Sequence, residues 1–303
     1  MSIAQESEGE AQKFDFAVKV ESRLTNLRLG EAVLAARRTS ERFVLVTEYV
    51  SPQQAGKLKE LNVCFFDAAG NAYLRAQNLY VYITGKKTEA KKEKPVKLFR
   101  VAGLKLLFYF LTEPGTETLN YREIEKLTGT PRATVGEMMK DLKNTGFLVN
   151  RGAKKRLLIR KDELLKRWVE GYGEQLRRKL LLSRFKSDKQ GNRWWEAIDI
   201  KDYQAEWGGE IAGGLLTDHL KPELVTIYAD SVLPKLQAKE GLRRSEKGEV
   251  EILRRFWKGS NSSATAPPLV VYADLIATAD RRNLETAQII YDRYLADFTK
   301  TAA

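Results

Sequence analysis

The chain has 303 residues, of which 43% are hydrophobic and 10% aromatic, and its formal net charge is +12. This length predicts two or three domains, and this apolar content excludes a disordered protein. A single cysteine, Cys64, excludes a disulfide framework, and a single histidine, His219, argues against a zinc site or a histidine-based triad. We therefore expect no metal and no cofactor.

The sequence predicts no membrane partner. It contains no run of about 18 apolar residues, which is the length that a spanning helix needs. Its first 12 residues are polar and acidic and lack the apolar stretch of a signal peptide. We expect a cytoplasmic protein.

The predicted fold class is α/β (α+β), beginning with a small α/β domain over residues 1–88. Apolar and β-branched runs predict its strands, and Ser51 is placed to cap one of its helices. The expected elements are a helix at 31–38, a strand at 42–50, a helix at 53–61, and strands at 63–66 and 79–84. We expect Cys64 to occupy a buried strand position. A charged linker, 86–95, follows the domain.

The strand-helix-strand order of this first domain has a faint similarity to restriction-endonuclease-like folds, with Glu48 late in the first strand. Such nucleases need a second carboxylate, for which Asp67 is the candidate, and a lysine near the glutamate. Val50 stands where that lysine is expected. The simpler interpretation is that Asp67 shapes a tight turn with Gly70 and Asn71.

The segment 98–160 has the pattern of a winged helix-turn-helix. Asn120 is predicted to cap a short helix, with Glu123 as its capping-box partner. Gly129 ends that helix in the left-handed conformation, and Pro131 occupies the first turn of the next helix. Two helices joined by about four residues give the helix-turn-helix geometry. We assign this domain to residues 89–165.

The second of these helices, 132–144, has one apolar face and one polar face. Val135, Met138 and Leu142 recur at helical spacing and are predicted to be buried. The opposite face is free to enter a DNA major groove, helped by the small Ala133 and Gly136. The expected DNA contacts on this helix are Arg132, Thr134, Lys140 and Lys143.

A basic hairpin follows. Apolar runs at 147–149 and 156–159 flank the polar tip 150–155, with Gly152 at the turn. A solvated hairpin is the simplest interpretation, but its place directly after a recognition helix favours a phosphate-contacting wing. The expected contacts here are Arg151, Lys154, Lys155 and Arg156.

The positive charge is concentrated in this middle part of the chain. Between Lys86 and Lys189 there are 27 lysines and arginines against 13 acids, a net charge of +14, so the rest of the chain is close to neutral. Such asymmetry is the electrostatic footprint of a nucleic-acid-binding protein. Double-stranded DNA is the predicted partner.

A helical connector is predicted from residue 161 to about 185, with an apolar stripe that includes Leu164, Trp168 and Tyr172. The stripe fits a helix that packs back on the winged-helix domain or onto a second copy of the chain. A solvated helix that links two domains is the alternative to a DNA-contacting or dimer-forming helix. The domain behind it, 166–303, is predicted to be α/β. Expected elements are a helix whose start is the glycine-rich segment 207–216, strands at 224–228, 250–253 and 269–272, and a final amphipathic helix at 287–298.

Two functional interpretations of this last domain, a phosphate-binding loop and an acid-base pair, are less favoured than structural ones. The glycine-rich segment lacks the Lys-Ser/Thr pair of a phosphate loop, so we expect close helix packing. Asp274 and Asp280 are conceivable as an acid-base pair, but helix capping by Asp280 with ion pairing to Arg281 or Arg282 is favoured.

Several strings resemble the AbiEi-type antitoxins and related transcriptional regulators of type IV toxin-antitoxin systems. They are Pro267–Ala287, Trp207–Ala212, Leu220–Tyr228 and, nearer the start, Phe66–Leu74. The resemblance implies an autorepressor whose C-terminal domain counteracts a cognate nucleotidyltransferase toxin. The winged helix here lies mid-chain, whereas the shorter antitoxins carry it at the N-terminus, which leaves the existence of a toxin partner open.

Three functions are therefore compared. The leading one is a non-enzymatic, sequence-specific DNA-binding regulator, dimeric if its operator is palindromic. The second is an enzyme, either a metal-dependent nuclease using Glu48 and Asp67 or a nucleotidyl-handling C-terminal domain. The third is an adaptor that uses the basic winged helix to bind protein.

Overall fold

The computed structural model describes residues 2–7, 10–21, 24–87, 97–151, 155–188, 193–258 and 263–299. The chain divides into two compact units, residues 1–93 and 94–303. Helices and mixed sheets occur in both units, so the predicted α/β class is confirmed. The predicted boundaries at residues 88 and 165, and the restriction-endonuclease-like order, stay predictions.

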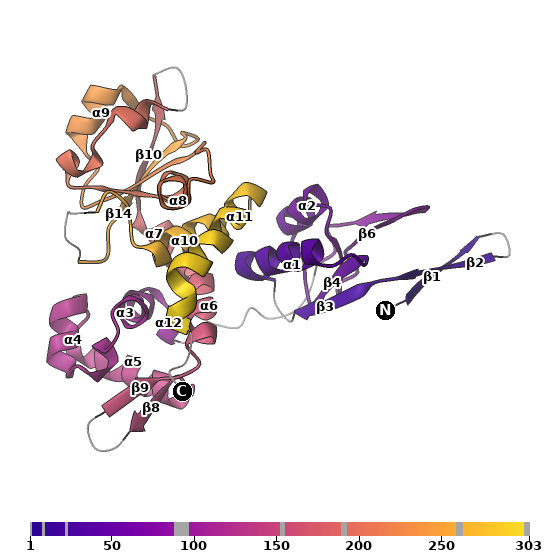
Figure 1. The fold of residues 1–303 in the computed structure, drawn as a ribbon, viewed down its shortest axis with the longest axis horizontal. Coiled ribbons are helices and arrows are strands. Elements are labelled where there is room, and N and C mark those ends of the chain that lie inside the picture. The colour runs from indigo at the N-terminus through magenta and orange to yellow at the C-terminus, as the bar shows by residue number, and fades with distance from the viewer. Residues whose placement is uncertain are drawn as a thin grey trace. The chain divides into compact units, whose positions relative to one another are not determined.

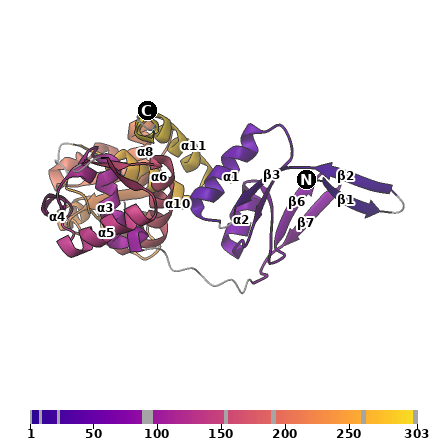
Figure 2. The ribbon, with the colours of Figure 1, turned by 90° about the horizontal axis from the view of Figure 1, so that it is seen from below.

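The first unit is built on a five-stranded sheet with the order β3-β4-β5-β6-β7. Strands β3, β4 and β5 are parallel, and β6 and β7 extend the sheet as antiparallel neighbours. A separate hairpin, β1–β2, projects beyond the sheet (Figures 1 and 2). The elements are β1 (Ser2–Ser7), β2 (Glu10–Asp15), β3 (Ala17–Glu21), α1 (Asn26–Arg38), β4 (Phe43–Thr47), α2 (Pro52–Glu60), β5 (Cys64–Asp67), β6 (Ala72–Ala76) and β7 (Leu79–Ile83).

The predicted cap of α2 is confirmed. The Ser51 hydroxyl accepts the amide of Gln54, and the Gln54 side chain accepts the amide of Ser51, which is a complete capping box. Cys64 is buried in the core with Phe14, Phe16 and Val44, as predicted. Burial raises the pKa of its thiol, which therefore stays protonated.

Strand β6 was expected to be a connecting segment. It lacks β-branched residues, and pairing with β7 stabilises it together with edge-on ring contacts of Tyr73 to Tyr80 and Tyr82. These contacts depend on the sheet, so the local pattern did not predict the strand.

The second unit begins with the predicted helices and hairpin in the predicted order. A short 3-10 helix, Lys97–Phe99, precedes them, and a second, Thr116–Thr118, follows the first long helix. The elements are α3 (Val101–Thr112), α4 (Tyr121–Thr128), α5 (Arg132–Asn144), β8 (Leu148–Arg151), β9 (Lys155–Leu158), α6 (Lys161–Gly171) and α7 (Arg177–Leu180).

Helix α6 packs back onto α3 instead of crossing solvent as a linker. Trp168 is fully buried, and its indole N–H donates to the carbonyl of Leu104 at 2.7 Å. A π-helical turn, Tyr172–Leu176, continues α6 into α7. The solvated-linker interpretation of the connector is therefore wrong.

The remainder of this unit contains a mixed sheet with the order β11-β12-β14-β10-β13. Strands β12 and β14 are parallel, and the other neighbouring pairs are antiparallel. Helices α8, α10 and α11 pack against one another, and α8 also contacts β11 and β12 (Figure 1). The elements are β10 (Leu181–Ser187), β11 (Glu206–Gly208), α8 (Gly209–Thr217), β12 (Val225–Ala229), α9 (Pro234–Glu240), β13 (Leu242–Arg244), β14 (Val250–Arg254), α10 (Pro268–Thr278), α11 (Arg281–Ile290) and α12 (Ala296–Thr299).

Two predicted elements are wrong. The strand expected at 269–272 is the start of α10, whose residues 269–276 are all buried. An apolar run buried on every side has no periodicity to distinguish helix from strand, and Pro268 in the first turn was the missed signal. The helix expected to reach residue 185 ends at Leu180, and 181–187 form β10 because they pair with β13 and β14.

Candidate nucleic-acid interface

Helix α4 begins with the capping box that the sequence predicts. The Asn120 side chain accepts the amides of Arg122 and Glu123, both at 3.0 Å. The Glu123 carboxylate accepts the Asn120 amide at 2.8 Å. These bonds satisfy N–H groups that a helix start leaves unpaired, so they fix the first residue of α4.

The turn between α4 and α5 is set by Gly129, Pro131 and Glu125. Gly129 has φ +68°, in the left-handed region, and its amide donates to the Glu125 carbonyl at 2.8 Å. Pro131 is the N-cap of α5, one position earlier than predicted, and its side chain makes no capping bond. The Glu125 carboxylate takes over that role by accepting the amide of Arg132 at 3.2 Å.

Helix α5 has the two faces that the sequence predicts. Val135, Met138 and Leu142 are buried, as is Met139. Arg132, Lys140 and Lys143 are exposed, whereas Thr134 is half-buried. A Cβ built on Gly136 would lie 3.6 Å from the Tyr121 ring, so position 136 faces α4 and not, as expected, the side that would enter a groove.

The two predicted strands of the wing are present, but the structure describes the side chains of only some of its predicted DNA-contacting residues. Lys154 and the turn residue Gly152 lie outside the described residues, and only the backbone of Arg151 and Lys155 is described. Their roles at the interface stay predictions.

Arg156 is used within the fold. Its guanidinium donates to the carbonyl of Leu119 and, at 3.2 Å, to that of Thr118. It also lies 5.5 Å from the centroid of the Tyr121 ring, within the range of a cation-π contact. The residue therefore fastens the base of the wing to the start of α4.

A connector from the C-terminal sheet contacts the helix-turn-helix. The Lys258 amide donates to the hydroxyl of Tyr109 on α3 at 2.9 Å, and the Lys258 ammonium group donates to the carbonyl of Lys126 on α4. Burial is the main cause that raises the pKa of Tyr109, so its hydroxyl stays protonated. The rings of Phe108, Phe256 and Trp257 pack together beside these bonds.

Asp274 is at the centre of a buried polar cluster behind this connector. Its carboxylate accepts hydrogen bonds from Tyr172 at 2.8 Å, Arg177 at 2.9 Å and Tyr228 at 2.9 Å. The amide of Gly209 adds a fourth at 3.2 Å. Burial and then the Asp274 charge raise the pKa of both tyrosines well above their usual value, so neither is poised to act as a base.

Arg177 also binds Glu251, at 2.8 Å, and Glu251 in turn binds Arg184. Burial opposes the charge of Arg177, but Asp274 and Glu251 together raise its pKa well above the usual value. Asp280 lies outside this cluster and caps α11, with Arg282 at 3.7 Å, as the simpler interpretation predicted. The cluster therefore joins α7, α10 and three strands as a structural network.

The glycine-rich segment serves close packing, as favoured above. A Cβ on Gly208 would lie 2.4 Å from the Tyr228 ring, and one on Gly209 would lie 2.7 Å from the Thr226 hydroxyl. Side chains here would push α8 away from β12.

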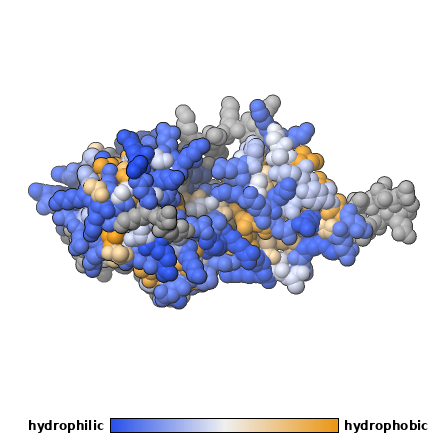
Figure 3. All heavy atoms as spheres, turned by 90° about the horizontal axis from the view of Figure 1, so that it is seen from above, coloured by the Kyte–Doolittle hydropathy of each residue, from blue (hydrophilic) through white to orange (hydrophobic). Residues whose placement is uncertain are grey.

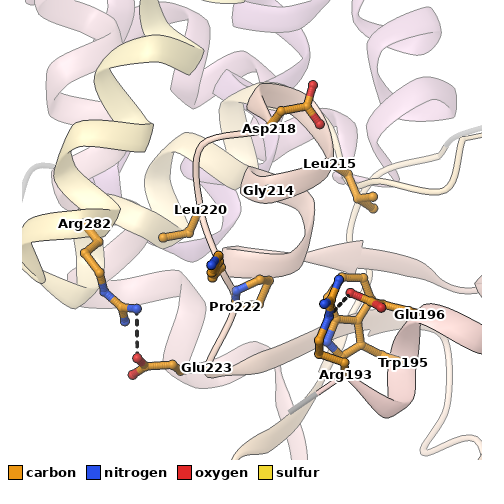
Figure 4. Close-up of a pocket in the computed structure, with 11 residues that line it drawn as sticks. Arg193, Trp195, Glu196, Gly214, Leu215, Asp218, Leu220, Pro222, Glu223 and Arg282 are labelled. Atoms are coloured by element: carbon orange, nitrogen blue, oxygen red, sulfur yellow. Dashed lines mark hydrogen bonds and ion pairs between the residues drawn. The ribbon is translucent and has the colours of Figure 1, made fainter.

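A pocket of about 610 Å³ opens beside α8 (Figure 4). The Glu210 carboxylate holds its loop by accepting the amides of Glu223 at 2.7 Å and Leu224 at 3.2 Å. Acidic and basic side chains are equal in number on its wall, so the pocket has no preference for a polyanion. The lining residues are Arg193, Trp195, Glu196, Gly214, Leu215, Asp218, Leu220, Lys221, Pro222, Glu223 and Arg282.

Asp67, one of the two nuclease candidates, makes hydrogen bonds within the fold. The Asp67 carboxylate accepts the amides of Val50 at 2.7 Å and Asn71 at 2.8 Å, and the Asn71 side chain at 2.7 Å. The two bonds from Asn71 are the turn contacts predicted for Asp67, and the bond from Val50 ties the turn to the segment after β4. Among the described residues, no group of three histidine, cysteine or acidic side chains is placed to hold a metal ion.

The described part of the chain contains no helix long and apolar enough to cross a membrane. In the space-filling view, the visible face is mainly hydrophilic, with apolar areas between the hydrophilic residues (Figure 3). Apolar areas of that kind are normal on protein surfaces.

Comparison with protein families gives one match. Residues 156–296 match a family model described as "Transcriptional regulator, AbiEi antitoxin, Type IV TA system". This confirms the resemblance expected from the C-terminal strings, but the match leaves out residues 1–155 and with them α4, α5 and the Phe66–Leu74 string. Neither the curated proteins nor the solved structures contain a match.

Proposed function

We propose that this protein regulates transcription by binding double-stranded DNA. The premise is the match of residues 156–296 to the AbiEi antitoxin type of transcriptional regulator. The observation that carries the proposal is the exposed, basic side of α5, preceded by a tight turn and followed by a hairpin. This is the arrangement in which helix-turn-helix proteins present a recognition helix to a major groove.

In this proposal the start of α5 reads bases and the rest of the helix-turn-helix unit holds phosphates. Arg132 and Thr134 contact base edges, because residues near the N-terminus of a recognition helix penetrate the groove. The proposed phosphate contacts are Lys140, Lys143, Arg151, Lys154 and Lys155. Arg156 acts indirectly, by holding the wing against α4.

The biological role that we infer is that of an antitoxin and autorepressor acting in the cytoplasm. A cognate nucleotidyltransferase toxin is the proposed second partner. A homodimer bound to a palindromic operator would match protein symmetry to DNA symmetry.

Selection from a random pool of double-stranded DNA tests the proposal. The full chain at low salt should enrich one sequence motif. Arg132→Ala should lower affinity for that motif by about 1–3 kcal/mol and relax the preference at one base pair. Failure of the intact protein to retain DNA would favour the protein-binding adaptor instead.

A nuclease assay separates the regulator from the enzyme alternative. We expect no Mg²⁺- or Mn²⁺-dependent cutting of DNA by the intact protein, because the Asp67 carboxylate already accepts hydrogen bonds from Val50 and Asn71. Metal-dependent cleavage that Glu48→Ala abolishes would overturn the regulator proposal as the main activity.

A further inference from the structure

We propose that Glu125 positions the guanidinium of Arg132 for base recognition, and that this pair sets the sequence specificity of the protein. The inference rests on the proposed function, because it concerns the DNA interface of α5. Glu125 had no assigned role in the sequence interpretation.

The argument begins with two hydrogen bonds to one carboxylate. Glu125 Oε1 accepts the backbone amide of Arg132 at 3.2 Å, and Glu125 Oε2 accepts Arg132 Nε at 3.4 Å. The first bond supplies the cap that Pro131 lacks. The second fixes the guanidinium relative to the helix that carries it.

The backbone of Glu125 strengthens this arrangement. Its carbonyl accepts the amide of Gly129, so the same residue closes the turn, caps α5 and holds the arginine. The two side chains remain accessible, with 62% of Arg132 and 37% of Glu125 exposed. The guanidinium is thus held at a surface and not buried.

The geometry leaves the outer part of the guanidinium available. With Nε directed at Glu125, the two Nη groups make no hydrogen bond to any described residue. Two parallel N–H donors are what an arginine uses to bind the O6 and N7 atoms of guanine. Because Glu125 already holds the arginine, Arg132 loses less conformational entropy when it binds DNA. At a wrong base pair, the negative charge of Glu125 remains close to the bases and disfavours binding.

Glu125→Gln separates the two functions of the carboxylate. The glutamine oxygen can still accept the Arg132 amide, but its NH₂ group cannot accept Nε. The matched control is Glu137→Gln, which removes one acid from the exposed side of α5. Among the described residues, Glu137 pairs only with Lys97, at 3.7 Å. Each change removes one negative charge, so both variants should repel DNA phosphates less than the wild type does.

The experiment measures affinities of the intact protein for its selected motif and for all single base-pair variants of it. We expect Glu125→Gln to reduce discrimination about tenfold at one base pair, the same one affected by Arg132→Ala. The double variant should lose no more than Arg132→Ala alone. Glu137→Gln should keep the wild-type preference at every position while raising affinity for non-specific DNA.

Two results would overturn the inference, and they are distinguishable. If the wild-type protein selects a motif but Glu125→Gln keeps its full preference, or if the two losses add, then Glu125 does not position Arg132. If the wild-type protein selects no motif, then the proposed function fails and the inference fails with it.

Discussion

At the scale of single residues, the proposed interface depends on side chains whose partners lie beyond a turn or further along the chain. Arg156 lies 37 residues from Leu119, and Glu125 lies seven residues from Arg132 across a turn. Both pairs place a charged group where it shapes the backbone as well as the surface. Replacing Arg156 or Glu125 should therefore change the stability of the fold and not only DNA binding.

Arg156→Ala should lower the melting temperature by about 2–4 °C, because it removes hydrogen bonds to two carbonyls and a ring contact worth about 1 kcal/mol at a partly exposed site. Thermal unfolding followed by circular dichroism measures this. Lys143→Ala, which removes an exposed charge from α5, is the control and should change the melting temperature little. Equal melting temperatures for wild type and Arg156→Ala would show that the contacts of Arg156 contribute nothing to stability.

Asp274→Ala should destabilise the second unit by about 3–5 kcal/mol, because it leaves the buried charge of Arg177 with one partner fewer. The expected result is a large fall in the melting temperature. Asp292→Ala is the matched control, because Asp292 is exposed and accepts a hydrogen bond from Gln288. A loss no larger than that of the control would exclude a structural role for the cluster.

At the scale of elements, two glycines of the helix-turn-helix should respond in opposite ways to alanine. Gly129→Ala places a side chain at φ +68° and should destabilise by about 1 kcal/mol. Gly136→Ala lies inside α5, where the new Cβ would make ordinary contact with Tyr121, and should stabilise by up to about 1 kcal/mol. Melting temperatures that shift in the same direction would contradict this assignment of the turn and helix.

The sequence predicted those elements whose signals are local. The caps at Ser51 and Asn120, the stop at Gly129 and the apolar spacing of α5 act within a few residues, so α2, α4 and α5 were located closely. Strands β6 and β10 depend on pairing with other strands, and the start of α10 is buried on all sides. Local patterns do not contain that information.

The candidate site was predicted only in part for the same reason. The exposed side of α5 follows from helical periodicity. The contacts of Arg156 with residues 118 and 119 and the bond between Glu125 and Arg132 arise only when the chain is folded. Sequence spacing therefore identified Arg156 as a basic wing residue but gave no sign that the fold itself uses its guanidinium.

At the scale of the whole molecule, the second unit joins the helix-turn-helix to the part of the chain that matches the regulator family. Lys258 bonds to α3 and to the last turn of α4, and Trp168 bonds to α3 from the opposite end of the matched region. These contacts give the C-terminal sheet a physical connection to the helix-turn-helix.

Lys258→Met should loosen the end of α4. Its ammonium group satisfies the Lys126 carbonyl near the helix C-terminus, where a cation contributes about 0.3–1 kcal/mol. Amide hydrogen exchange in α4 should become about two- to fivefold faster, with Lys235→Met as a surface control. Unchanged amide exchange in α4 would mean that the Lys258 ammonium group does not stabilise α4, and that the C-terminal sheet is coupled to the helix-turn-helix through α3 instead.

The dependence of DNA affinity on salt tests the central claim most directly. Five proposed phosphate contacts predict that the logarithm of the association constant falls with the logarithm of the salt concentration with a slope of about −4 to −5. Replacing Lys140 and Lys143 by alanine together should make that slope shallower by about 2, whereas Arg156→Ala should leave it unchanged. An affinity that does not vary with salt would contradict DNA binding by this surface.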